Sequence, residues 1–308
     1  MPWSLWTDPR EPSGESRLIR TPVNQMRAKR VTLARQFFDE LTSKGVVAAA
    51  RRTSRFFRKK IGISPEKIQV EVSKSVNDIF GGVVAYGPFK GLRLKNENWI
   101  NDPDRNYRAA ILLGLFEQEI LETLKSIPST HKTFINVGAG HGLYSIGVLI
   151  HNTFDISHSY EVLEQRQKYI ESNARLNKVH DRVRIHGAAT RDSFEELRKN
   201  HDVDLSKCVI LCDIEGGEFD LFDEKTFVTL KGSIIIIELH EFFVADGEAR
   251  VRDLKRAAST CFRITELTTG ARDLSQFPEI KMMSDTERWL IVSELRPRLM
   301  TWLRLDPK

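Results

Sequence analysis

The amino-acid sequence predicts an α/β fold with a doubly wound, mostly parallel sheet of seven strands and helices on both faces. From residue 133 onward, short apolar runs alternate with segments whose apolar residues recur at helical spacing. The run 233–239 contains four consecutive isoleucines and is almost wholly apolar, as a central strand covered on both faces should be. Three closely spaced glycines follow the first run, at the strand end where such sheets bind ligands.

The predicted elements follow one another in a regular order. Residues 67–95 indicate short strands with turns, and 107–127 form a predicted amphipathic helix that Pro128 closes. Strands are predicted at 133–138, 156–162, 182–188, 207–213, 233–239, 261–267 and 288–294. Helices are predicted between them at 142–152, 164–177, 193–200, 217–224 and 247–259. The chain is thereby divided into an N-terminal segment 1–62, a strand and helix lead-in 63–128, and a cofactor-binding domain 129–308.

The N-terminal segment is basic, and the rest of the chain is mildly acidic. Residues 1–60 hold 14 Lys and Arg against 5 Asp and Glu, although the whole chain has a net charge of only +5. The acidic balance of the main domain argues against a nucleic-acid-binding surface there. Residues 24–60 show helical spacing. They indicate a helical pair that packs on the main domain or on a second copy in a homo-oligomer, a helix that contacts an anionic membrane surface, or a nucleic-acid-binding arm.

The composition excludes several classes of protein. The 308 residues contain no apolar stretch of the ~20 residues that a membrane-spanning helix needs. The start of the chain lacks the basic-then-apolar pattern of a secretory signal. The three cysteines form no disulfide framework and no Cys-x-x-Cys pair. We therefore expect a cytoplasmic protein with reduced thiols, peripheral to the inner face of the membrane if residues 24–60 bind lipid.

Glycines at the end of the first predicted strand indicate a cofactor site. Gly138, Gly140 and Gly142 let the backbone bend sharply and approach a ligand, and the helix after them directs free N–H groups toward it. Glu161 ends the next predicted strand, where a carboxylate can accept both hydroxyls of a ribose. A nucleotide-like cofactor is therefore expected. The G-x-G-x-G spacing disfavours, without excluding, an NAD-dependent dehydrogenase, whose fingerprint is G-x-G-x-x-G.

Three carboxylates follow the predicted strand 207–213. Asp213, Glu215 and Glu218 lie so close in sequence that they repel one another unless they bind a cation, accept hydrogen bonds or keep a proton. The dipole of a following helix accounts for Glu218 and less well for Asp213. We therefore predict functional roles for Asp213 and Glu215.

Glu238 and His240 end the apolar strand 233–239 and, by alternation, lie on the same side. A histidine beside carboxylates is a candidate general base, because its ordinary pKa is near neutral. A divalent cation is also considered. Its candidate ligands are Asp213, Glu215, Glu238 and His240, which would have to converge from two strands.

Segment 134–145 resembles motif I of class I S-adenosylmethionine-dependent methyltransferases. The sequence Asp-Ile-Glu-Gly-x-Glu at 213–218, followed by Ile-Glu-Leu-His at 237–240, is similar to the FkbM family of O-methyltransferases. The segments 86–91 and 114–119 also resemble members of that family, and the resemblance covers roughly residues 82–245. It implies a Rossmann-like class I methyltransferase fold.

The resemblance also implies roles for individual residues in binding S-adenosylmethionine. The glycine loop, with Ala139 inside it, would wrap the methionine and ribose, Glu161 would hold the ribose hydroxyls, and Asp213 would face the transferred methyl group. Ala188 and Ala189 would lie along the adenine. Asn136 stands where the family usually has Asp, and it keeps a carbonyl acceptor for the methionine ammonium while losing the charge.

The predicted function is O-methyl transfer to a hydroxyl of a glycan or of another small-molecule or polymer acceptor. Asp213, Glu215 and His240 are the predicted catalytic residues, with His240 or Asp213 as the base. The alternative is a non-catalytic binding or scaffold module that keeps the fold. Methylation of nucleic-acid bases is disfavoured, because the strand before Asp213 does not end in the Asn/Asp-Pro-Pro-aromatic turn that cradles a flipped base.

Overall fold

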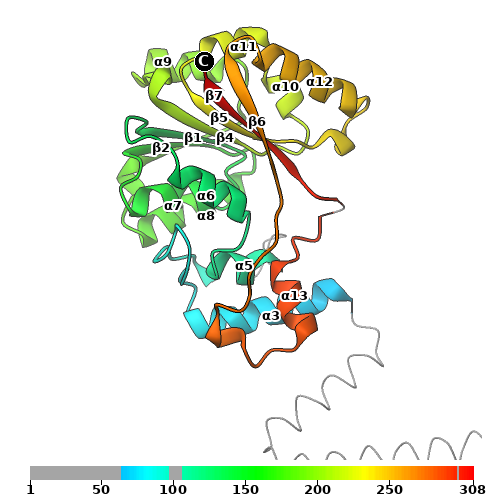
Figure 1. Ribbon diagram of the computed structural model, residues 1–308. Coiled ribbons are helices and arrows are strands. Elements are labelled where there is room, and N and C mark those ends of the chain that lie inside the picture. The colour runs from blue at the N-terminus through cyan, green and yellow to red at the C-terminus, as the bar shows by residue number, and fades with distance from the viewer. Residues whose placement is uncertain (1–63, 97–105, 297) are drawn as a thin grey trace, which may run out of the picture. The chain divides into compact units, whose positions relative to one another are not determined.

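The computed structural model describes residues 64–96, 106–296 and 298–308 (Figure 1). The chain divides into two units, Met1–Ile63 and Ser64–Lys308, and the described residues belong to the second. The predicted N-terminal helical extension, with its basic segment 24–60, therefore lies outside the described residues. None of the described helices is both long and apolar enough to cross a membrane.

A seven-stranded, mostly parallel sheet forms the centre of the unit, as the sequence predicts. Its strand order is β3-β2-β1-β4-β5-β7-β6. Strands β1 to β5 are parallel, whereas β7 runs antiparallel to both β5 and β6. The order reverses between β1 and β4, so the crevice at their carboxyl ends is the expected ligand site. The strands are β1 (Thr133–Val137), β2 (Ile156–Tyr160), β3 (Val183–His186), β4 (Cys208–Cys212), β5 (Ile234–Glu238), β6 (Phe262–Thr268) and β7 (Thr301–Pro307).

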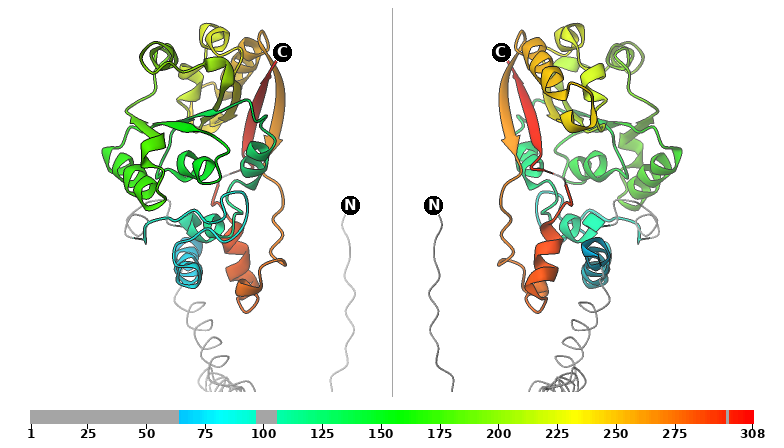
Figure 2. Two further views of the ribbon diagram at one scale, coloured as in Figure 1. Left: turned by 90° about the vertical axis from the view of Figure 1, so that its left-hand side faces the viewer. Right: turned by 90° about the vertical axis from the view of Figure 1, so that its right-hand side faces the viewer.

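Helices cover both faces of this sheet (Figures 1 and 2). One face carries α6 (Gln118–Lys125), α7 (Leu143–Ile150) and α8 (Glu164–Leu176). The other carries α9 (Ser193–Asn200), α10 (Glu218–Leu221), α11 (Glu224–Thr229) and α12 (Gly247–Ala258). The two cores follow from strand alternation: Val209 and Leu211 of β4 face the first set of helices, and Ile210 faces the second.

A smaller group of helices lies beyond one end of the sheet. Helices α3 (Pro65–Phe80), α5 (Arg108–Leu112) and α13 (Asp285–Val292) pack together, so the segment before the sheet meets the segment between β6 and β7 (Figure 1). The prediction of short strands over 67–95 is wrong for residues 67–80, which lie in α3. Pro65 occupies the first turn of α3, Gly81 ends it in the left-handed conformation, and its buried residues recur at helical spacing.

Two further element predictions are corrected. The single helix predicted over 107–127 is two helices, α5 and α6, because Gly114 and Glu117 between them have positive φ angles of 67° and 45°. Residues 288–292 of the strand predicted at 288–294 belong to helix α13, which begins with a capping box between Ser284 and Glu287. The seventh strand is β7, further along the chain.

Candidate active site

The glycine loop joins β1 to α7 and contacts both neighbouring strands. Gly138, Gly140 and Gly142 have φ angles of 85°, 55° and 89°, a region that favours glycine. The N–H groups of Gly138 and Ala139 donate to the carbonyl of Tyr160 in β2, at 3.0 and 2.9 Å. On the other side, a Cβ at residue 138 would fall 1.8 Å from the carbonyl oxygen of Asp213. The loop is therefore held between the ends of β2 and β4.

Glu161 lies at the end of β2 and fixes the middle of this loop. Its Oε2 accepts the Gly140 N–H at 2.8 Å, and its Oε1 accepts the Leu163 N–H at 2.9 Å. Each carboxylate oxygen keeps a further lone pair for a ligand hydroxyl. Apart from Gly140 itself and its two chain neighbours, no residue has a heavy atom within 4 Å of the position that a Cβ on Gly140 would occupy. Open space thus lies beside an oriented carboxylate, an arrangement that fits a ribose.

The remaining predicted cofactor residues lie at the same edge of the sheet. Asn136 is 2% exposed on β1, and its Nδ2 donates to Ser145 Oγ of α7 at 3.0 Å. This bond leaves the amide oxygen as the acceptor for the predicted ammonium contact. Ala188 and Ala189 follow β3, with Ala188 exposed and Ala189 partly buried.

Asp213, Glu238 and His240 converge from the ends of β4 and β5. His240 Nε2 lies 3.6 Å from Asp213 Oδ1 and 3.8 Å from Glu238 Oε2. Glu215 Oε2 is 3.5 Å from the same nitrogen, on a side chain that is 69% exposed. Side chains from the ends of two strands therefore do come together, as the sequence suggested. The cluster lies beside the glycine loop, because Asp213 contacts Gly138.

Glu218 has a different place from the other three carboxylates. It opens α10, as the sequence predicts, but its side chain is fully buried. Its Oε1 accepts the N–H of His240 and its Oε2 accepts the N–H of Gly216, both at 2.8 Å. Glu218 thus joins the loop after β4 to the end of β5 and holds His240 in place.

The charges of this cluster favour a positive species within it. Burial lowers the pKa of His240, but Glu218, Asp213 and Glu215 together outweigh it, so the pKa is raised above the ordinary value. Burial raises the pKa of Asp213, although His240 and Arg296 act in the opposite direction. Four carboxyl groups, those of Asp213, Glu215, Glu218 and Glu238, therefore surround His240 where the two strands end.

The match with a family model decides what kind of protein this is. Residues 101–282, more than half of the chain, match the model described as the Methyltransferase FkbM domain. The chain belongs to the FkbM methyltransferase family. Family and fold make it an S-adenosylmethionine-dependent methyltransferase.

Solved structures resemble this FkbM methyltransferase only distantly. The O-methyltransferase from Bacillus cereus, in complex with SAH, is 13% identical, with 82% of this chain and 96% of that chain covered and a TM-score of 0.40. The METTL16 MTase domain is 13% identical, with 79% and 80% covered and a TM-score of 0.46. Streptococcus pneumoniae Sp1610, in complex with S-adenosyl-L-methionine, is 15% identical, with 61% and 72% covered and a TM-score of 0.40. No curated protein matches the chain closely enough to count as a relative.

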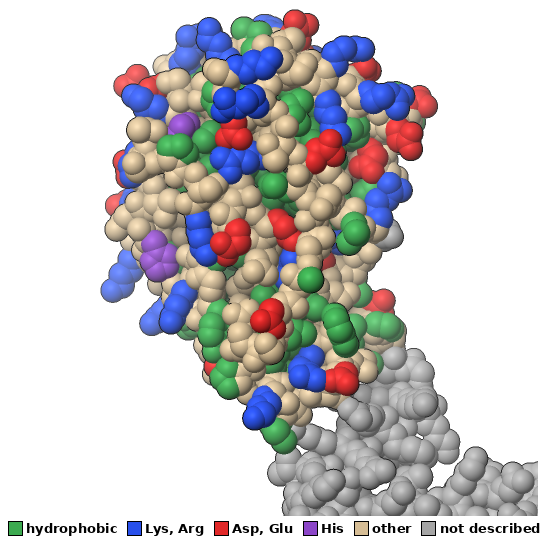
Figure 3. Space-filling view, in the orientation of Figure 1, with side chains coloured by type: hydrophobic (Ala, Val, Ile, Leu, Met, Phe, Trp, Pro, Cys, Tyr) green, Lys and Arg blue, Asp and Glu red, His purple; other side chains and the backbone are tan. Residues whose placement is uncertain are grey.

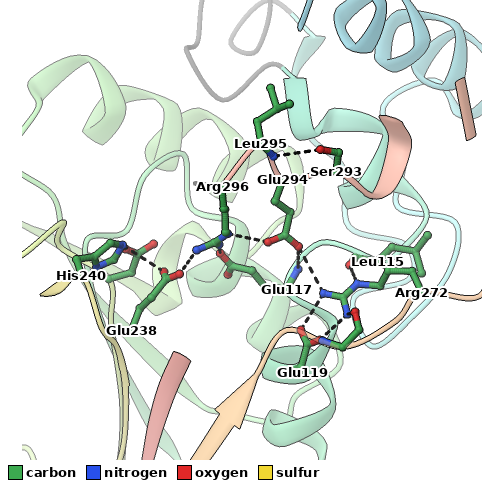
Figure 4. A network of polar contacts seen from close by, with 12 residues as sticks. Leu115, Glu117, Glu119, Glu238, His240, Arg272, Ser293, Glu294, Leu295 and Arg296 are labelled. Atoms are coloured by element: carbon green, nitrogen blue, oxygen red, sulfur yellow. Dashed lines mark hydrogen bonds and ion pairs between the residues drawn. The ribbon is translucent and has the colours of Figure 1, made fainter. Parts of the chain in front are cut away.

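The FkbM methyltransferase has a buried ion-pair network that the sequence analysis missed (Figure 4). Arg296, in the segment that leads into β7, contacts Glu117, Glu238 and Glu294. Arg272 extends the network from Glu294 to Glu119. No spacing pattern could have paired residue 117 with residue 296. The one available signal was the resemblance of segment 114–119 to the family.

Glu117 connects this network to the helix behind the glycine loop. Tyr144 of α7 donates its hydroxyl to Glu117 Oε2 at 2.6 Å. Burial raises the pKa of Glu117 to about 8, although Arg296 acts in the opposite direction. The network therefore links α7, the helix behind the glycine loop, to Glu238 through buried charged groups.

Proposed function

We propose that this FkbM methyltransferase transfers the methyl group of S-adenosylmethionine to a hydroxyl oxygen of a glycan. The observation that carries the proposal is the cluster of Asp213, Glu238 and His240 beside the glycine loop. A hydroxyl is a poor nucleophile, so the protein must hold its oxygen in line and remove its proton. Groups that can do so stand at the carboxyl ends of β4 and β5, next to the open space at Gly140 and Glu161.

Separate residues supply cofactor binding and acceptor activation in this proposal. S-adenosylmethionine supplies a methyl group already activated on a sulfonium. Glu161 and the glycine loop orient the cofactor, with Asn136 toward its methionine part and Ala188 and Ala189 toward its adenine. Asp213, Glu215 and His240 stand where the acceptor hydroxyl would lose its proton. The divalent cation is a separate proposal, because methyl transfer to a hydroxyl does not by itself require one.

An exposed aromatic ring supports a sugar as the acceptor. Phe243 is 59% exposed, and its ring stacks on His240 with 5.9 Å between centroids and 7° between planes. An apolar ring face beside the reacting group is a surface on which the carbon face of a sugar can pack. Figure 3 shows Lys, Arg, Asp and Glu side chains interspersed over the face drawn, without the basic stripe expected of a nucleic-acid site.

The basic segment 24–60 suits an acceptor that is carried on an anionic lipid or polymer. Peripheral contact with the inner face of the membrane and assembly into a homo-oligomer through this segment remain proposals. Co-sedimentation of the full chain with anionic vesicles at low salt tests the first of them. If the chain does not bind the vesicles, the proposed membrane contact is wrong.

The proposed reaction is tested with radiolabelled S-adenosylmethionine and a panel of glycans, lipid-linked saccharides and hydroxyl-bearing small molecules, with divalent ions supplied. We expect label in a hydroxyl-bearing acceptor and not in RNA or DNA. The alternative, a non-catalytic module, is favoured by Asn136, which lacks the charge of the family's usual Asp. Cofactor binding without turnover on every acceptor class would support that alternative and count against the proposed reaction.

A further inference from the structure

Three side chains of the candidate active site are arranged as metal ligands. One ligand atom from each of Asp213, Glu238 and His240 lies within 4.8 Å of the other two. His240 Nε2 is 3.6 Å from Asp213 Oδ1 and 3.8 Å from Glu238 Oε2, which is too long for hydrogen bonds. Donor atoms that share one ion at about 2.1 Å are themselves about 3 Å or more apart. Within the part of the chain that the structure describes, no other three residues meet this condition.

Two of these ligand atoms are buried without a hydrogen-bond partner. The side chain of Glu238 is 1% exposed, and Arg296 binds its Oε1 while its Oε2 is unpartnered. Asp213 Oδ1 is likewise buried and unpartnered. Leaving a buried acceptor unsatisfied costs about 1–3 kcal/mol, and more for a charged group. These two unpartnered oxygens come from the ends of different strands, and each lies within 3.8 Å of His240 Nε2. One cation bound between them would give both oxygens a partner.

The neighbouring contacts keep the ligands oriented. Arg296 fixes one oxygen of Glu238 and leaves the other free, and Glu218 holds the backbone N–H of His240. His240 Nδ1 lies 3.7 Å from Glu218 Oε1, so a small rotation of the ring would bring it within hydrogen-bond distance. A partner on the second ring nitrogen is the usual way in which a protein orients a histidine ligand.

We propose that Asp213, Glu238 and His240 bind a divalent transition-metal ion of the Mn²⁺ type. Two carboxylates and one imidazole suit such an ion better than Ca²⁺ or Mg²⁺, which prefer oxygen ligands throughout. Three protein ligands leave positions open for an acceptor oxygen. Glu215 is near His240 Nε2 but lies outside the group of three whose ligand atoms are mutually close. The role of the ion in activating a hydroxyl rests on the proposed function, but its binding does not. With the ion present, His240 serves as a ligand.

The test is a Mn²⁺ titration of the full-length, untagged chain, followed by electron paramagnetic resonance of the free ion. We expect one saturable site per chain that excess Mg²⁺ displaces poorly. Glu238→Gln and Asp213→Asn should each weaken binding at least tenfold. Glu241→Gln is the matched control, because its carboxylate pairs with Arg298 and lies outside the three ligands. His158→Gln controls for the separate histidine pair of His158 and His186. Both controls should bind Mn²⁺ as the wild type does.

Binding of S-adenosylmethionine to the same proteins, measured with a chelator present to remove metal ions, distinguishes the metal-site proposal from the proposed methyltransferase function. Cofactor binding without saturable Mn²⁺ binding would overturn the metal site and leave the methyltransferase proposal intact. Mn²⁺ binding that is lost in Glu238→Gln, with no cofactor binding, would support the metal site and count against the proposed function. Equal Mn²⁺ affinity in the wild type and in both ligand variants, with folding verified by circular dichroism, would also overturn the metal site.

Discussion

Gly138 packs so closely against Asp213 that a Cβ at residue 138 would fall 1.8 Å from the carbonyl oxygen of Asp213. The N–H of Asp213 in turn donates to the carbonyl of Val137 at 2.9 Å. The glycine loop, which would hold the cofactor, therefore contacts the backbone of Asp213, whose side chain would face the acceptor hydroxyl. A shift of either one moves the other.

Gly138→Ala should lower both stability and cofactor affinity, because the new methyl group must push the Asp213 backbone away and residue 138 has a φ of 85°. Thermal unfolding and calorimetry with S-adenosylmethionine measure the two effects. Gly270→Ala is the control, since its nearest contact at the Cβ position is a side-chain oxygen at 3.4 Å. A Gly138→Ala protein with the stability and affinity of the wild type would refute this account of the loop.

Glu161→Gln should weaken S-adenosylmethionine binding by about 10- to 100-fold, the cost of losing a charge-assisted hydrogen bond. The amide also places an NH₂ where the N–H of Gly140 or Leu163 now donates, which disturbs the loop. Calorimetry compares the variant with Glu164→Gln, an exposed residue at the start of α8. Similar affinities for the two variants would contradict a role for Glu161 at the ribose.

The sheet and the cofactor loop could be predicted because their signals are local. The isoleucine run of β5 and the glycines after β1 each identify an element within a few residues. The prediction failed at residues 67–80 and 288–292, where helices α3 and α13 are decided by their caps and by packing against each other. The caps at Gly81 and at Ser284 with Glu287 each involve only one or two residues, so they give a weaker sequence signal than an apolar run.

The candidate site was only partly predictable for the same reason. Asp213, Glu238 and His240 end two strands, so parallel pairing brings them together. Arg296 reaches Glu238 from the segment before β7, which the sequence analysis had not placed next to β5. Its ion pairs depend on the antiparallel return of β7, a feature of the whole fold rather than of any motif.

Arg296→Ala should lower the free energy of unfolding by about 3–5 kcal/mol, because it leaves the buried carboxylate of Glu238 without its counter-charge. Arg298→Ala removes an arginine that is 54% exposed and should cost less than about 1 kcal/mol. Urea unfolding of the two variants gives the comparison. Equal destabilisation would show that the network contributes little to stability.

His158 should make the fold less stable in acid. Burial, followed by the charges of His186, His201 and Arg184, lowers its pKa from 6.5 to about 3. At His158 the unfolded chain then binds a proton more readily than the folded chain. The contribution of His158 to the free energy of unfolding is therefore fully present above about pH 6.5 and is lost as the pH decreases toward 3. Urea unfolding between pH 7.5 and 4 should show a shallower loss for His158→Gln. Identical slopes in the two proteins would contradict the prediction.

Calorimetric titration of S-adenosylmethionine into the full-length chain tests the central claim most directly, because every proposed role in methyl transfer depends on the cofactor site at residues 138–142 and Glu161. We predict saturable binding of one molecule per chain, weakened in Glu161→Gln and retained in Glu164→Gln. Absence of binding by a folded wild-type protein, or binding that Glu161→Gln leaves unchanged, would contradict the account.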